Sequence, residues 1–396
     1  MKKLNLQALQ ANLDHRMQQN LDECKIGGAS VYVHQDGQPD FIRCYGKTNT
    51  DTGEAMPLNA IFRLASMTKP ITAAAVLLQV QRGLLDLDAP VETYLPAFAN
   101  MMVGREQDDK AVPDHRLKEP IRVFHLLTHT SGVIAADFVG LHQSIPRECM
   151  SSLAGVVDYI GTHILLSNDP MDNAMYSPCS AFDVAARLVE ITSGFPYAVF
   201  LRRNLFDPLD MPDTTFFPSD EQWGRMTAMH NRVDGQNQVL PMDKITFGDF
   251  PLTYTCGGAS LASTLTDYAH FAAMLLHDGV YNGRQILTSE SVAAMRLPRI
   301  PETVPGISAM VTWGLGVRVL KNHPVLPRGT FGWSGAYGTH FFVDPENKLF
   351  AVYMKNSGYD GGAGAQTANE FEEDVENACL CTHTSSHFRT GVPSSV

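Results

Sequence analysis

The fold of this chain is predicted from one run, Phe62-Arg63-Leu64-Ala65-Ser66-Met67-Thr68-Lys69-Pro70. Within it, Ser66 and Lys69 stand three residues apart, and residues at that spacing share one face of an α-helix. Pro70 is tolerated only in the first turn of a helix, so the helix begins near Ser66. Free N–H groups and the positive end of the helix dipole then lie at the hydroxyl. The run therefore places a nucleophile and an amine together at a helix N-terminus.

The residues that follow this run, 71–78, are nearly free of charge and rich in helix formers, which predicts a helix buried on most sides. Burial penalises a charged amine, so Lys69 in its neutral form could take the proton of Ser66. A second interpretation stays open at this point. The S-x-x-K pattern arises by chance in many chains, and serine is an ordinary N-cap residue.

The composition is that of a soluble globular protein large enough for two lobes. The chain has 396 residues, of which 44% are hydrophobic and 18% charged. It carries 30 Lys and Arg against 42 Asp and Glu, a formal net charge of −12. This acidity argues against nucleic acid or an anionic membrane as the main partner.

The N-terminus and the cysteines predict a cytoplasmic protein. Residues 1–7 begin like a signal peptide, but Asn5 and Gln7 interrupt any apolar segment, and no stretch approaches the length of a transmembrane helix. The seven cysteines show neither the spacing of a zinc site nor a C-x-x-C redox motif. Reduced thiols in the cytoplasm are therefore expected.

Hydrophobic periodicity predicts strands near both ends of the chain and helices between them. The expected strands are 29–33, 41–45, 313–319, 339–343 and 349–354. The expected helices are 6–22, 125–129, 182–193, 267–276 and 366–379. This order favours an α/β (α+β) fold in which the N- and C-terminal segments form one antiparallel sheet flanked by helices, with a mostly helical lobe inserted.

The predicted boundaries follow from that order. Residues 1–85 and 250–381 form the α/β lobe of a single catalytic domain, and residues 86–249 form the helical lobe. Residues 382–396 are rich in Ser, Thr and His and are expected to be a flexible tail.

Acyl transfer needs a second proton-handling group and an oxyanion hole besides a serine and a lysine. Tyr176 precedes a predicted helix from a loop-like stretch, so its phenol could project into a cleft. In residues 332–338, Gly335 allows close approach of a substrate, and the N–H of Ala336 on that strand could join the N–H of Ser66 as two oxyanion donors. Alternatively, this glycine-rich segment is only a hairpin turn.

Together these motifs resemble the serine β-lactamase-like proteins, with a β-lactamase/transpeptidase-like fold. That family includes class C β-lactamases, D-alanyl-D-alanine carboxypeptidases, D-aminopeptidases, family VIII carboxylesterases and acyltransferases of the simvastatin-synthase type. The resemblance covers about residues 21–378. It is carried by Ser66 to Lys69, Tyr176 to Pro178, Trp333 to Ala336 and three further segments at 83–91, 126–132 and 257–264.

The resemblance implies an acyl-enzyme mechanism. Ser66 attacks a carbonyl carbon, Lys69 and Tyr176 move protons, and the N–H groups of Ser66 and Ala336 hold the oxyanion. Which of Lys69 and Tyr176 is the base stays open. The third motif contributes the implied substrate-binding residues Trp333, Ser334 and Gly335. No metal or organic cofactor is implied for this reaction.

Two departures from the family pattern narrow the range of substrates that we expect. The lactamase and peptidase branches usually carry Asn where this chain has Pro178, and Lys or His where it has Trp333. Both changes remove recognition of an anionic amide, and tryptophan at the second position matches the esterase branch. A neutral small-molecule ester with a short to medium acyl group is therefore the expected substrate. Hydrolysis and acyl transfer to an alcohol are not distinguished by these motifs.

Two other readings of the same chain are a β-lactamase or D-amino-acid peptidase using the same three residues, and a non-catalytic scaffold. The intact Ser66, Lys69 and Tyr176 argue against the scaffold.

A zinc site at His125 and His129 lacks a third ligand. The G-x-S-x-G elbow of α/β-hydrolases is absent from the sequence. Cys256 is expected to be a buried apolar residue rather than a reactive thiol.

Overall fold

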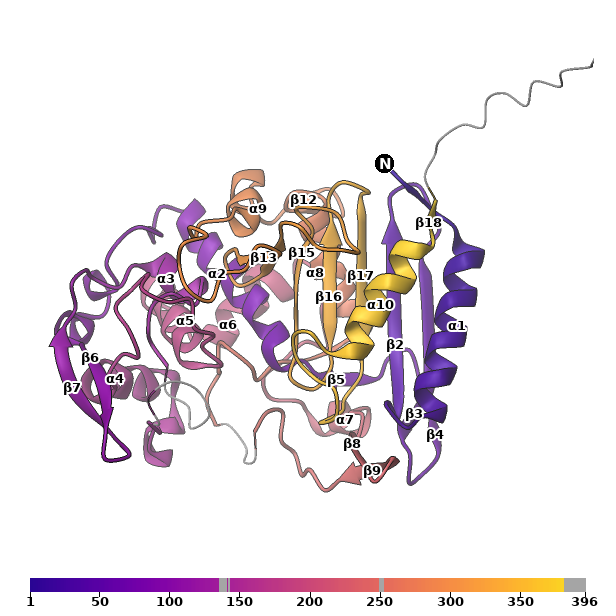
Figure 1. Ribbon diagram of the computed structural model, residues 1–396, viewed down its shortest axis with the longest axis horizontal. Helices are drawn as coiled ribbons and strands as arrows, with labels where there is room; N and C mark the ends of the chain where they lie inside the picture. Colours follow the sequence, from indigo (N-terminus) through magenta and orange to yellow (C-terminus); the bar gives the residue numbers. More distant parts are fainter. Residues whose placement is uncertain (135–140, 142, 249–252, 381–396) are drawn as a thin grey trace, which may run out of the picture.

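An antiparallel sheet of eight strands forms the centre of the computed structural model (Figure 1). The model describes residues 1–134, 141, 143–248 and 253–380, so the predicted tail lies outside the described residues. In spatial order the strands are β13 (Val311–Trp313), β14 (Arg318–Leu320), β15 (Phe331–Ser334), β16 (His340–Asp344), β17 (Leu349–Met354), β2 (Gly28–Gln35), β3 (Phe41–Asn49) and β4 (Glu54–Ala55).

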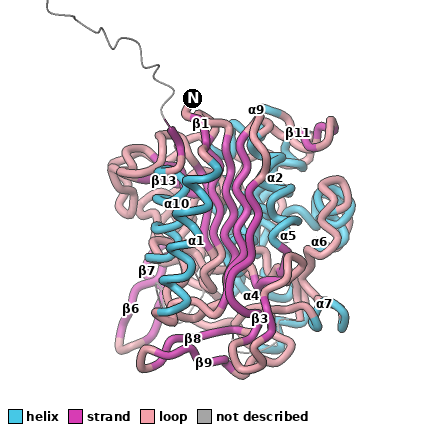
Figure 2. The backbone as a smooth tube through the Cα atoms, turned by 90° about the vertical axis from the view of Figure 1, so that its right-hand side faces the viewer, coloured by secondary structure: helices cyan, strands magenta, loops and turns pink. Residues whose placement is uncertain are grey.

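Helices cover both faces of this sheet. α1 (Leu6–Asp22) and α10 (Gln366–Asn377) pack together on one face, and α8 (Leu265–Leu276) packs on β16, β17 and β2 from the other. Figure 2 shows the strands between α1 and α10 on one side and α2 (Thr68–Gln81) and α5 (Ser180–Ser193) on the other. Layers of helix, sheet and helix bury both faces of the sheet.

The alternation of side chains along β17 explains this burial. Leu349, Ala351 and Tyr353 belong to the core beneath α1 and α10, while Phe350 and Val352 belong to the core on the opposite face. Successive side chains of a strand point to opposite faces, so a strand that is apolar at every position must be covered on both.

The two ends of the chain meet in this sheet. β2, near the N-terminus, pairs antiparallel with β17, with Val33 opposite Ala351. In a separate two-stranded sheet, β1 (Lys3–Leu4) pairs with β18 (Cys379–Leu380). The predicted antiparallel sheet from both termini, flanked by helices and carrying a helix-rich insertion, is confirmed.

The remaining elements are shorter helices and two-stranded pairs. The helices are α3 (Val123–Leu127), α4 (Leu153–His163), α6 (Tyr197–Leu201), α7 (Asp220–Gly224) and α9 (Ser289–Arg296). The pairs are β5 (Ile61–Arg63) with β10 (Ala262–Thr264), β6 (Met102–Gln107) with β7 (Lys110–Arg116), β8 (Met229–Val233) with β9 (Gln236–Leu240), and β11 (Val280–Tyr281) with β12 (Arg284–Gln285).

Across the described ranges, no single helix has the length and apolar composition to cross a bilayer. Two consecutive helical segments reach the required length and apolar composition only when taken together, and the chain bends by 74° between them. These segments are Ser180–Ser193 and Tyr197–Phe206.

Three sequence predictions were wrong in detail. The strand expected at 313–319 is two strands, β13 and β14, because Gly316 adopts a φ of +69° and the chain turns back there. The closing helix stops at Asn377, and Cys379 pairs with Leu4 instead. The helix expected at 125–129 ends at Leu127, and His129 has a φ of +59° outside it.

We predict that Phe371→Ala lowers the free energy of unfolding by about 3–5 kcal/mol, because truncating a buried aromatic ring leaves a cavity. Phe371 is 0% exposed and stacks on Tyr353 with ring centroids 5.3 Å apart. Urea denaturation followed by circular dichroism measures the change. Phe217→Ala, at a ring that is 53% exposed, is the matched control and should change stability by less than about 0.5 kcal/mol. Equal effects of the two substitutions would contradict this account of the core.

Candidate active site

Ser66 lies in a short 3-10 turn, η1 (Ala65–Met67), that leads directly into α2. Neither helix start has a side-chain cap hydrogen bond, so the alternative in which Ser66 is an N-cap was wrong. Ala65 adopts a left-handed φ of 45°, which costs an L-residue roughly 1–2 kcal/mol. Strain of this kind is typical of functional sites. Pro70 falls in the first turn of α2, as predicted.

Lys69 is fully buried, and its amine contacts three oxygens. Nζ lies 3.2 Å from Ser66 Oγ, 2.6 Å from the carbonyl oxygen of Pro178 and 3.0 Å from that of Gly258. The two carbonyls can only accept, so two N–H groups of the amine are committed to them. The remaining position of the amine points at Ser66 Oγ. As an ammonium, Lys69 donates a hydrogen bond to Ser66 Oγ; as a neutral amine, it accepts one from the Ser66 hydroxyl. The same geometry therefore allows a proton to pass from Ser66 to Lys69 and back.

Tyr176 completes the contacts of the serine, because its hydroxyl lies 2.8 Å from Ser66 Oγ. The next residue, Ser177, holds the loop in place: its N–H donates to His129 Nδ1 at 3.0 Å, and its hydroxyl donates to the carbonyl of Val133 at 2.9 Å. Lys69 Nζ lies 4.9 Å from the centre of the Tyr176 ring. The structure thus brings Ser66, Lys69 and Tyr176 into one group with Ser66 Oγ at its centre.

An aromatic cluster surrounds the phenol. The ring of Tyr176 lies 5.5 Å from that of Trp333, 6.0 Å from that of Trp313 and 4.5 Å from that of His129. Trp313 and Trp333 contact each other edge to face at 4.6 Å. This packing fixes the phenol and makes one wall of the site apolar.

Two neighbours on β15 point to opposite sides of the sheet. Trp333 reaches the phenol of Tyr176, whereas the hydroxyl of Ser334 lies 2.8 Å from His340 Nδ1. His340 in turn contacts Glu372, whose pKa falls to about 2 because His340 and Arg318 outweigh the opposing effect of burial. The structure therefore does not bring the Ser334 side chain to Ser66, and only its backbone borders the site.

The turn after β15 packs directly on the backbone before Ser66. A Cβ on Gly335 would lie 2.1 Å from the carbonyl oxygen of Leu64, so only glycine fits there. Thr339 Oγ1 donates to that same oxygen at 2.9 Å. Ala336 lies in the turn rather than on the strand, which corrects the sequence prediction. Leaving aside bonds within helices and strands, neither the N–H of Ser66 nor that of Ala336 donates to a backbone carbonyl of the described residues.

His129 is a supporting residue whose role the sequence did not reveal. Burial and the nearby Lys69 hold its pKa well below the usual range, so it is neutral. Its Nδ1 accepts from the N–H of Ser177, which leaves the proton on Nε2, and its ring lies 4.3 Å from that of Trp313 and 4.5 Å from that of Tyr176. Segment 126–132 resembles the family, but residue spacing does not predict the left-handed turn at His129.

Two other sequence questions are answered by the structure. His125 Nδ1 accepts from the N–H of Arg122 and His129 Nδ1 accepts from the N–H of Ser177, so the two histidines serve different local contacts. Cys256 is fully buried, and burial raises the pKa of its thiol well above the usual range, as expected for a structural residue. The six cysteines of the described part, Cys24, Cys44, Cys149, Cys179, Cys256 and Cys379, are free thiols.

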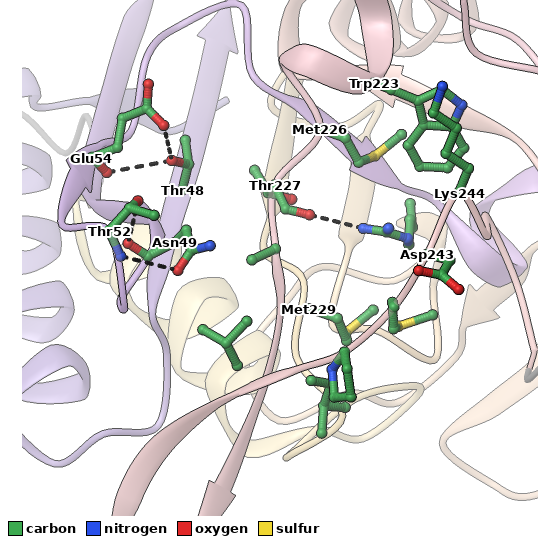
Figure 3. A pocket seen from close by; sticks show the side chains of 16 residues that line it. Thr48, Asn49, Thr52, Glu54, Trp223, Met226, Thr227, Met229, Asp243 and Lys244 are labelled. Carbon is green, nitrogen blue, oxygen red and sulfur yellow. Dashed lines mark hydrogen bonds between the residues drawn. The ribbon is translucent and has the colours of Figure 1, made fainter. Parts of the chain in front are cut away.

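The strand that leads to Ser66 also borders a hollow of about 790 Å³, shown in Figure 3. Arg63 reaches it from β5 and donates to the carbonyls of Thr227 at 2.8 Å and Ile245 at 2.7 Å. Burial lowers the pKa of Arg63 to about 10. These bonds anchor β5 to the segment after α7. Ser66, Lys69 and Tyr176 do not line this hollow.

Comparisons with known proteins agree with this geometry. Lovastatin esterase of Penicillium rubens is 32% identical over 403 residues, which cover 92% of this chain and 97% of that protein. Esterase EstB of Burkholderia gladioli is 29% identical over 389 residues, covering 92% and 94%. Among solved structures, EstCE1, a hydrolase with promiscuous acyltransferase activity, superposes with a TM-score of 0.75 at 22% identity, covering 93% and 99%.

The family-level comparison covers nearly the whole described chain. The model of the Beta-lactamase family matches residues 10–373, a range that contains Ser66, Lys69, Tyr176 and the turn after β15. With the fold, the layered sheet and the serine group all in place, this chain belongs to the β-lactamase family.

Proposed function

We propose that this protein is a serine carboxylesterase that forms an acyl-enzyme on Ser66 and acts on neutral esters of short to medium acyl chain. One observation carries the proposal: Ser66 Oγ lies within hydrogen-bond reach of two proton-handling groups, Tyr176 at 2.8 Å and Lys69 at 3.2 Å. A serine hydroxyl is a weak nucleophile until a neighbouring base takes its proton. The same group could pass the acyl chain to an alcohol in place of water.

The chemistry follows from these contacts. Ser66 Oγ attacks the ester carbonyl carbon as its proton passes to the Lys69–Tyr176 pair. The carbonyl oxygen becomes an oxyanion, for which the N–H groups of Ser66 and Ala336 are the proposed donors. Collapse breaks the bond to the alkoxy oxygen, which leaves as an alcohol with the proton from the pair. Water then attacks the acyl-enzyme in the same way and releases the carboxylic acid and Ser66.

The surroundings favour a neutral ester. Pro178 has no N–H, and Lys69 already uses its carbonyl, so this position offers nothing to a substrate amide. Trp333 places an indole where the peptidase and lactamase branches place a cation. The nearby Arg318 is bonded to Glu372 at 2.6 Å and is not available as a free counter-charge. An anionic substrate would therefore gain little here.

A small cavity beside the aromatic cluster fits the proposed acyl or alkyl group. Its volume is about 280 Å³, just below the roughly 300–1,000 Å³ typical of ligand pockets. Its lining includes the apolar residues Ile307, Val311, Trp313 and Trp333, together with Arg318, which is paired with Glu372. We propose that short and medium chains are accommodated here and that long chains are not.

Replacing the nucleophile tests the proposal directly. Ser66→Ala should reduce turnover of p-nitrophenyl butyrate by at least about 10³-fold, because no acyl-enzyme can form. Mass spectrometry should show one acyl adduct on Ser66 in the unmodified protein and none in the variant. Ser151→Ala, at an exposed serine, is the control and should retain full turnover. Unchanged turnover in Ser66→Ala would exclude the proposed function.

The proton-handling pair is tested by Tyr176→Phe and Lys69→Met. Each should lower kcat by about 10²–10⁴-fold while leaving the Ser66 hydroxyl in place. Lys69→Met also leaves two buried carbonyls without donors, so its melting temperature must be measured with its activity. Tyr176→Phe keeps the ring packing and isolates the hydroxyl. If it retained normal kcat, Tyr176 would have no part in proton transfer.

Relative kcat/KM values separate the two candidate functions. We expect p-nitrophenyl butyrate to be processed at least about 10-fold better than nitrocefin or a D-alanyl peptide, since the charge of Arg318, the cation that lines the small cavity, is already paired with Glu372. The opposite ranking would favour the β-lactamase or peptidase alternative. A p-nitrophenyl ester with a long acyl chain should lose kcat/KM relative to butyrate if the small cavity limits chain length.

A further inference from the structure

A second group of chemically active side chains lies where the β2–β3 hairpin meets the end of α8. His34 is near the end of β2, Asp36 follows it in the turn, and His277 immediately follows α8. His277 Nε2 lies 2.9 Å from Asp36 Oδ1, and His34 Nε2 lies 3.3 Å from the same oxygen. The three potential ligand atoms all lie within 4.8 Å of one another. None of these residues contributes to the Ser66 group.

The ring of His34 is held in a fixed orientation. Its Nδ1 lies 2.7 Å from Asp40 Oδ1, and the other oxygen of Asp40 accepts from the hydroxyl of Tyr32 at 2.5 Å. Phe350, the cross-strand partner of His34, stacks on the imidazole with centroids 5.0 Å apart. A carboxylate that binds one ring nitrogen while the other faces outward is the usual support of a metal-binding histidine.

An imidazolium would donate to both Asp40 and Asp36, whereas a neutral His34 can donate to only one of them. A neutral imidazole has one N–H, and that of His34 is committed to Asp40. Its Nε2 then presents a lone pair to Asp36, and two acceptors face each other at 3.3 Å. A metal cation between His34 Nε2 and Asp36 Oδ1 would be bound by both atoms, so that each acceptor would gain a favourable contact. The same cation would accept the lone pair of His277 Nε2.

We propose that His34 Nε2, His277 Nε2 and Asp36 Oδ1 bind one zinc ion. Two imidazoles and one carboxylate, with water in the fourth position, are a common ligand set for zinc. Oxygen-preferring ions such as Mg²⁺ and Ca²⁺ are disfavoured by the two nitrogen ligands. The ion would offset the carboxylates of Asp36 and Asp40, and Lys348 Nζ lies 3.9 Å from the other oxygen of Asp36.

Such an ion would join elements that are far apart in the sequence. Asp36 and His277 are separated by 241 residues, and their contact connects the hairpin turn to the C-terminal end of α8. Both residues are partly exposed, so an ion can reach them from solvent. The ion would bind the folded state and not the unfolded chain, and so would raise stability. The Ser66 reaction is independent of it.

The test uses full-length protein stripped with EDTA, desalted and titrated with Zn²⁺ against a fluorescent zinc indicator. We expect one tight site per chain in the unmodified protein and a melting temperature raised by about 2 °C or more at saturation. His277→Gln and Asp36→Asn should weaken that site by at least about 10-fold and abolish the thermal shift. Mg²⁺ and Ca²⁺ at the same concentrations should produce no shift.

His163→Gln is the matched control, because His163 is an exposed histidine on α4 outside this group. It should keep both the tight site and the thermal shift. This control is needed because the chain has 14 histidines and 7 cysteines that could bind zinc weakly. Equal zinc affinity in the unmodified protein, His277→Gln and Asp36→Asn would overturn the proposal, as would the lack of a saturable site. Esterase activity in these variants is read separately, so failure of one proposal does not affect the other.

Discussion

The buried amine of Lys69 is the contact on which the arrangement of the candidate site depends. Its three oxygen partners come from three separate segments: the turn before α2, the loop before α5 and the segment before β10. Burying an amine is costly unless its hydrogen-bonding capacity is met, and here each partner meets part of it. Satisfying the amine therefore draws the segments together and sets the position of Ser66 between Lys69 and Tyr176.

The sheet decides which side chains of the third motif face the serine group. Trp333 and Ser334 are adjacent on β15, so one must point toward Tyr176 and the other away from it. The structure assigns the apolar ring to the site and the hydroxyl to His340. An indole beside the phenol, with Arg318 already paired to Glu372, makes this side of the site apolar and nearly neutral. The proposed substrate class therefore depends on which residues of β15 face the site as much as on the residue types.

Much of the fold was predictable because its signals are local. The apolar runs of β2 and β17 and the helical spacing of residues 6–22 were recognised from the sequence, and the structure confirms both the elements and the antiparallel sheet. The error at 313–319 has a physical reason: an apolar run resembles one strand unless the left-handed turn at Gly316 is anticipated. His129 was weighed as a metal ligand because spacing alone does not reveal that its ring supports Tyr176.

The sequence by itself determined the Ser66–Lys69 pair, since helical geometry brings residues at that spacing to one face whatever surrounds them. Proline at 70 was likewise compatible with a local requirement, the first turn of a helix, whereas glycine at 335 is required by the tertiary contact with the carbonyl oxygen of Leu64. Only the tertiary structure decided that Tyr176, 110 residues away, reaches Ser66, that Ser334 turns from the site, and that His34, Asp36 and His277 meet at one end of the sheet. The reason is that contacts between distant segments depend on how helices and strands pack, and packing is a property of the whole core rather than of any single run.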